Sequence, residues 1–160
     1  MNAQAAAVNV EKVIREYLPY VLHLSLATER DNAPWVCEVH FAYDDDLNLY
    51  FRSLASRRHS MEISENPKVA GNIIKQHSLD ESAVGVYFEG IARLLEADEE
   101  LKIAYKCIKE RLHAEDNILE EAKKKDGHKF YKITVKNWYV FGRFGLPHGQ
   151  KHKLEWKYEK

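Results

Sequence analysis

The sequence has few cysteines, almost no net charge and no long hydrophobic run. Its 24 Lys and Arg residues nearly balance 25 Asp and Glu residues, which gives a formal net charge of −1 at pH 7 over 160 residues. A general nucleic-acid-binding protein carries a basic excess, so this balance argues against nucleic acid as a partner. No apolar stretch approaches the roughly 18–20 residues that span a bilayer, so we expect no membrane partner either.

The two cysteines, Cys37 and Cys107, exclude a zinc site built from cysteine alone, because two thiolates are too few. Residues 1–8 contain a short alanine run without a basic region, so they do not have the pattern of a signal peptide. We therefore expect a cytoplasmic protein whose thiols are reduced rather than joined in a disulfide.

The signature motifs of several enzyme classes are also missing. The sequence contains no GxGxxG, no phosphate-binding P-loop and no GxSxG, so dinucleotide-binding, nucleotide-hydrolysing and serine-hydrolase classes have no support. It has no internal repeat and no low-complexity linker. Its length and its 45% hydrophobic content predict a single folded domain over residues 1–160.

The spacing of apolar residues predicts where helices and strands lie. Asn9 and an apolar stripe predict a helix over residues 9–18, after which the period falls from 3.6 to two. Gly90, inside a predicted strand, suggests a bulge or a close backbone approach. The predicted strands are 21–27, 34–43, 47–53, 69–75, 83–96, 130–135 and 138–141.

Helices are predicted between these strands. Ser56 is the expected N-cap of a short helix, and Asp98 is the expected N-cap of a longer one. A charged helical piece follows at about 114–125, so residues 98–125 form a predicted helical insertion, and 142–160 form a polar C-terminal tail. The short connections between the early strands favour an antiparallel meander. The predicted fold is mainly β with peripheral helices, a small antiparallel barrel.

A basic cluster, Ser56, Arg57, Arg58 and His59, stands where a strand passes into a predicted helix. A helix N-terminus presents free backbone N–H groups and the positive end of the helix dipole. Basic residues oppose that dipole, so their presence there suggests that they meet an anion such as phosphate. The alternative is a solvated surface cluster.

Two groups of histidines have some features of metal sites. Glu38 and His40 share one strand face with His23 of the neighbouring strand, which suits a metal site or an acid/base pair, but exposed or hydrogen-bonded structural roles are commoner. His148 and His152 have the i, i+4 spacing of zinc-binding helices, yet nearby proline and glycine indicate a loop. The sequence therefore predicts no metal ligands.

Cys37 shares its strand face with Trp35, Val39 and Phe41, which indicates a core position rather than a nucleophile. The aromatic residues around Phe141 suit a core or an interface, although they could also stack on a planar cofactor.

Five segments carry a resemblance to a known family through their order and spacing. Taken together, they resemble the pyridoxamine 5′-phosphate oxidase-like, FMN-binding split-barrel superfamily, and within it a small uncharacterised bacterial subgroup. The resemblance covers about residues 18–95, with a weaker echo over 130–156. The segments are LSLAT (24–28), PWVCEVHFAYD (34–44), LYFRS (49–53), SRRH through ENPKVAG (56–71) and FEGIARL (88–94).

The resemblance implies a split β-barrel homodimer with two FMN molecules at the subunit interface. It implies that one strand lines the flavin, largely through its backbone, that the end of the next strand also contacts it, and that a basic pair holds the phosphate. The implied cofactor-binding residues are Cys37, Glu38, Val39, His40, Phe41 and Ala42 on the strand, Arg52 and Ser53 after it, Arg58 and His59 with Ser56 and Arg57 beside them, and, more loosely, Phe141 and Lys151.

The chain departs from the oxidase itself at three positions. Cys37 and Ala42 replace basic residues at the two ends of the flavin strand, and Gly85 replaces a glutamine. The resemblance thus implies a flavin-dependent oxidoreductase with an unknown substrate, and it names no catalytic residue. The alternatives are a non-catalytic flavin-binding or sensor module, a deazaflavin-binding protein, or a haem-binding protein with His128, His148 or His152 as axial ligand.

Overall fold

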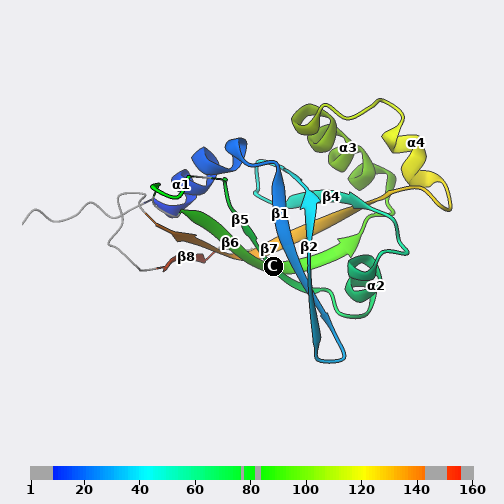
Figure 1. Ribbon diagram of the computed structural model, residues 1–160. Coiled ribbons are helices and arrows are strands. Elements are labelled where there is room, and N and C mark those ends of the chain that lie inside the picture. The colour runs from blue at the N-terminus through cyan, green and yellow to red at the C-terminus, as the bar shows by residue number, and fades with distance from the viewer. Residues whose placement is uncertain (1–8, 77, 82–83, 143–150, 156–160) are drawn as a thin grey trace, which may run out of the picture.

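The computed structural model describes residues 9–76, 78–81, 84–142 and 151–155; in the last segment, Lys153 is the one side chain described. One curled antiparallel sheet of eight strands forms the centre of the molecule (Figure 1), in the order β2-β1-β5-β6-β7-β4-β3, with β8 paired to β7. The strands are β1 (His23–Arg30), β2 (Ala33–His40), β3 (Ala42–Tyr43), β4 (Leu49–Ser53), β5 (Lys68–Ile73), β6 (Gly85–Leu94), β7 (Lys129–Phe141) and β8 (Lys151–Glu155).

Short helices surround this sheet: α1 (Val10–Tyr17), a 3₁₀ turn η1 (Leu18–Tyr20), α2 (Arg58–Glu65), α3 (Asp98–Leu112) and α4 (Ile118–Lys123). Figure 1 shows α3 and α4 together at the β4 side of the sheet, away from α1. The prediction of a mainly β fold with peripheral helices is confirmed. Among the residues that the structure describes, no helix has the length and apolar character needed to cross a membrane.

Two hydrophobic clusters hold the fold together. The larger lies inside the curl of the sheet and under α1, where Phe41, Phe51, Phe88 and Trp138 are completely or almost completely buried. The smaller joins α3 and α4 to the outside of β4 and β7, with Phe130 fully buried at its centre. The helical insertion is therefore packed onto the barrel rather than extended from it.

Strand β2 lies at one edge of the sheet. It pairs in register with β1 along its whole length, through a tight turn in which Asp31 and Asn32 both have positive φ values, of 56° and 60°. Among the described residues, no strand pairs with the other edge of β2. Its N–H and C=O groups on that side are therefore accessible to something other than protein backbone.

The helix starts differ from the sequence predictions. Ser56 does not cap α2: the helix starts at Arg58, and the N-cap is Arg57, without a side-chain capping bond. The reason is a tight turn in which the N–H of Arg57 donates to Leu54, so Ser56 lies within the turn. Asp98 is likewise the first residue of α3 rather than its cap, and its carboxylate favours the positive end of the helix dipole.

The C-terminal strands are also longer than predicted. Residues 130–135 and 138–141 belong to the single strand β7, because β7 passes the polar pair Lys136 and Asn137 with a register shift opposite Glu89 and Gly90. The bulge or close approach expected at Gly90 is confirmed: an added Cβ would lie 2.6 Å from the Thr134 carbonyl oxygen.

Two other predicted boundaries also differ from the structure. The charged helical piece predicted over 114–125 is helical only in α4, and residues 151–155 of the predicted polar tail form strand β8. The expected loop role of His148 lies outside the described residues.

Candidate functional site

A cavity of about 720 Å³ opens where the curl of the sheet is incomplete, between edge strand β2 and the end of β4. Small-molecule sites usually enclose about 300–1,000 Å³, so the cavity is large enough for a cofactor. Its lining residues are Trp35, Cys37, Glu38, Val39 and His40 from β2, Arg52, Ser53 and Leu54 from β4 and its loop, Arg57, Arg58 and His59 at the start of α2, Ile108, Leu112 and Ala114 from the insertion, and His128.

Most of the residues implied by the resemblance meet at this cavity, although they come from three separate stretches of the chain. The exceptions lie elsewhere. Phe41 and Ala42 are fully buried in the two cores, and Ser56 is exposed in the turn before α2. Phe141 pairs with Lys151 through the backbone, at the end of β7 remote from Lys129, which pairs beside the cavity.

His59 joins three elements at the floor of the cavity. Its Nε2 lies 2.7 Å from Ser53 Oγ on β4, and its Nδ1 lies 3.3 Å from Cys37 Sγ on β2. Burial, and then the nearby positive charge of Arg57, lower the pKa of His59, so the imidazole is neutral at pH 7. Both contacts are hydrogen bonds when the Cys37 thiol donates to Nδ1 of His59 and the Nε2–H group of His59 donates to the Ser53 hydroxyl. Both ring nitrogens are therefore engaged inside the protein.

The Cys37 thiol is not activated by this contact. Burial raises its pKa, and the negative charges of Glu38 and Glu62 raise it further. A cysteine nucleophile needs the opposite, an environment that stabilises the thiolate. Cys37 is thus a half-buried thiol that contacts His59, whereas the sequence predicts a core position for it.

Arg57 and Arg58 are the exposed cations of the site. Arg57 forms no ion pair among the described residues, has an exposed side chain and is the N-cap residue of α2. Arg58 donates from Nε to Glu62 at 2.7 Å, and its guanidinium carbon lies 4.3 Å from the centre of the Trp35 ring. Neither contact uses the two terminal nitrogens of Arg58, which remain to bind an anion.

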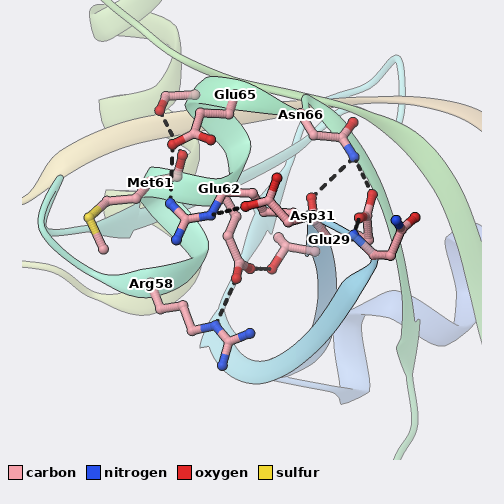
Figure 2. A network of polar contacts seen from close by, with 11 residues as sticks. Glu29, Asp31, Arg58, Met61, Glu62, Glu65 and Asn66 are labelled. Carbon is pink, nitrogen blue, oxygen red and sulfur yellow. Dashed lines mark hydrogen bonds and ion pairs between the residues drawn. The ribbon is translucent and has the colours of Figure 1, made fainter.

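Glu62 anchors this end of α2 to strand β1 (Figure 2). Its carboxylate is 2% exposed and accepts hydrogen bonds from the Thr28 hydroxyl and from Arg58. Burial acts to raise the pKa of Glu62, but these two hydrogen bonds and the charge of Arg58 together lower it below its ordinary value. The group is therefore a buried carboxylate that stays ionised at neutral pH.

Two further contacts in Figure 2 fix the other end of α2. Arg30 pairs with Glu65 at 3.1 Å, and the Asn66 amide donates to the Glu29 carboxylate at 2.8 Å. The helix that presents Arg57 and Arg58 is thus held against the sheet at both of its ends.

The opposite wall of the cavity belongs to the helical insertion. Arg52 forms an ion pair with Glu121 of α4, and Glu121 also accepts from Nδ1 of His128 at 3.0 Å. The hydrogen bond from His128 is the main cause that lowers the pKa of Glu121. Ile108 and Leu112 of α3 add an apolar surface. Sequence reasoning missed this wall, because an apolar stripe on a helix indicates only that the helix packs against something.

Glu38 and His40 of β2 and His23 of β1 form the grouping that the sequence suggests as a metal site or an acid/base pair. Glu38 accepts a hydrogen bond from Ser25, and the rings of His40 and His23 lie 4.3 Å apart across the strand pair. Among the residues that the structure describes, no three His, Cys, Asp or Glu side chains converge as metal ligands.

Comparison with known proteins identifies the family of the chain and other proteins that share its fold. A model of the family described as pyridoxamine 5′-phosphate oxidase matches residues 10–142. A UPF0306 protein of Klebsiella pneumoniae (strain 342) is 32% identical over 81 residues, which are 50% of this chain and 55% of that protein. The chain thus matches about half the length of this curated relative.

Two solved structures share the fold at low identity. A heme binding protein from Mycobacterium smegmatis superposes with a TM-score of 0.72 at 14% identity, over 94% of this chain and 59% of that one. A candidate pyridoxamine 5′-phosphate oxidase from Listeria innocua superposes with a TM-score of 0.64 at 18% identity, over 82% of this chain and 98% of that one. These similarities show that the fold is shared, but they assign no function to individual residues.

Proposed function

Because the chain belongs to the pyridoxamine 5′-phosphate oxidase family, we propose that its cavity binds FMN and that the protein is a flavin-dependent oxidoreductase. The observation that carries the proposal is the placement of Arg57 and Arg58, two exposed guanidinium groups at a helix N-terminus, on the cavity that the free edge of β2 lines. An arginine fork matches the geometry of a phosphate monoester.

The remaining walls suit the flavin ring. The edge of β2 with which no strand of the described residues pairs offers alternating N–H and C=O groups, which complement the imide edge of the ring. Ile108, Leu112 and Val39 supply apolar surface for its flat faces and exclude water. The flavin, when bound, supplies the hydride chemistry, while the protein residues bind it, orient it and shield it.

We further propose that the functional unit is a homodimer. Phe141 and Lys151, which the resemblance connects with the cofactor, lie far from the cavity of their own chain: a strand as long as β7 spans about 40 Å. A second copy would bring them to the cavity. Light scattering should give the mass of two chains, and a monomer with full FMN affinity would contradict the proposal.

Haem is a second candidate ligand, and one observation favours it. His128 lines the cavity, and its Nδ1 faces the Glu121 carboxylate, which is the arrangement that orients metal-ligating histidines. The similarity to a heme binding protein adds to this. Haemin titration of the wild type and of His128→Ala tests it: a Soret band that the substitution abolishes would support haem, and none would exclude it.

The FMN proposal is tested by calorimetric titration with FMN and with riboflavin, which lacks the phosphate. Arg58→Ala should weaken FMN by roughly 1.5–3 kcal/mol, the contribution of a charge-assisted hydrogen bond, and leave riboflavin unchanged. An unchanged FMN affinity would remove the phosphate role of Arg58. Reduction of the bound flavin by NADH or NADPH then separates an oxidoreductase from a non-catalytic module.

A further inference from the structure

We infer that Trp35 is a positioning residue, which fixes the guanidinium group of Arg58 in the orientation that receives the cofactor phosphate. The inference rests on the proposed binding of FMN, and it assigns a role to a residue that the sequence pattern places in the core.

Trp35 does not behave as a core residue. Its side chain is 40% exposed, and it belongs to neither hydrophobic cluster, although it lies on the strand face that also carries the buried Val39. It stands on β2 at the cavity, close to the hairpin turn. A large aromatic ring left open to solvent on a cavity wall needs an explanation other than burial.

The contact that Trp35 makes supplies that explanation. The Arg58 guanidinium carbon lies 4.3 Å from the centre of the Trp35 ring, well within the distance at which a cation is attracted to an aromatic face. The Nε atom of the same group donates to Glu62, which is 2% exposed and held in turn by Thr28. The guanidinium group is thus restrained by a ring on β2 and by a carboxylate on its own helix.

This restraint matters because a free arginine side chain loses rotamer freedom when it binds a ligand, and that loss weakens binding. A guanidinium group fixed before the ligand arrives avoids most of the loss. Arg57, the other exposed cation of the site, has no such restraint among the described residues, so it adds charge without a fixed direction. Trp35 therefore contributes to phosphate binding through Arg58 and not by touching the phosphate.

The binding test uses Trp35→Leu, with Val36→Thr as matched control. Val36 is the next residue of β2, is 60% exposed and does not line the cavity. Trp35→Leu should weaken FMN about fivefold, leave riboflavin within twofold, and have no further effect when Arg58→Ala is already present. Trp35→Phe, which keeps an aromatic face, should restore most of the affinity. An equal loss for riboflavin would overturn the inference, because Trp35 would then contact the flavin ring itself.

A second measurement needs no cofactor, so it separates failure of this inference from failure of the FMN proposal. The ¹⁵N relaxation of Arg58 Nε should report a rigid side chain in the free wild-type protein and a mobile one in Trp35→Leu. A mobile Arg58 side chain in the wild type would overturn the inference whether or not FMN binds. If the Arg58 side chain is rigid in a wild-type protein that fails to bind FMN, the positioning role of Trp35 stands and the proposal that FMN is the ligand is refuted.

Discussion

Arg111 connects the helical insertion to the barrel, and its replacement gives a sharp test of that connection. It lies in the last turn of α3, donates from Nε to the Phe41 carbonyl at 3.1 Å and from Nη2 to Leu18 at 2.8 Å, and also bonds the Val21 carbonyl. Its guanidinium carbon lies 4.9 Å from the centre of the Phe41 ring. Burial lowers the pKa of Arg111, as expected for a cation withdrawn from water.

Arg111→Met keeps the length of the side chain and removes all of these donors. Each charge-assisted hydrogen bond contributes about 1.5–3 kcal/mol when well buried, but Arg111 is only half-buried and water can replace part of it. We therefore expect a loss of about 3 kcal/mol in the free energy of unfolding, which lowers Tm by roughly 6–12 °C in a chain of this size.

Urea unfolding followed by circular dichroism measures this loss. Arg111→Lys, with one ammonium group in place of the fork, should recover less than half of it. Lys102→Met is the matched control, because Lys102 is an exposed cation of the same helix that pairs with its neighbour Glu99. A loss below about 1 kcal/mol for Arg111→Met would show that these contacts do not hold α3 to the barrel.

Three further predictions concern stability and reactivity. Because the pKa of the Glu62 carboxyl is lowered on folding, its stabilising effect is complete at pH 7 and declines as the pH falls below the pKa of the unfolded chain, about 4.3. In urea titrations, the difference in unfolding free energy between the wild type and Glu62→Gln should therefore shrink between pH 5 and pH 3. A constant difference would contradict the lowered pKa. Gly90→Ala should cost about 1–3 kcal/mol, since its Cβ would lie 2.6 Å from a backbone oxygen; an unchanged Tm would refute the close approach. In a Cys107→Ser background, Cys37 should react with iodoacetamide more slowly than a free thiol at pH 7, because its pKa is raised; faster reaction would indicate a thiolate.

The strands and the cationic part of the site were predictable because both depend on residues that are close together in the sequence. Leu24 and Leu26 alternate with polar residues along β1, and such a pattern has period two in any context. Arg57 and Arg58 stand at a strand-to-helix junction, so their proximity to a helix N-terminus needs no tertiary information. The sequence could therefore locate the cations, although it predicts the N-cap at Ser56, one residue before the observed N-cap Arg57.

The insertion wall was not predictable, since it depends on contacts between distant segments. Ile108 and Leu112 form an ordinary apolar stripe, and the surface that they face depends on contacts with the barrel such as the bonds from Arg111 and the packing of α3 and α4 around Phe130. The pairing of Arg52 with Glu121 spans 69 residues and follows no sequence period. The predicted core position of Trp35 is wrong for a related reason. The alternation of apolar and polar residues identifies the strand face on which Trp35 lies, but not the residue at which that face extends beyond the core.

We propose above that the cavity beside Arg58 holds FMN. The most direct measurement is the absorption spectrum of the purified protein between about 350 and 500 nm, repeated after addition of FMN and removal of the excess by gel filtration. We expect a retained flavin spectrum and a raised Tm in the wild type, with both effects reduced in Arg58→Ala. A protein that stays colourless and shows the same Tm with and without FMN would contradict the proposal.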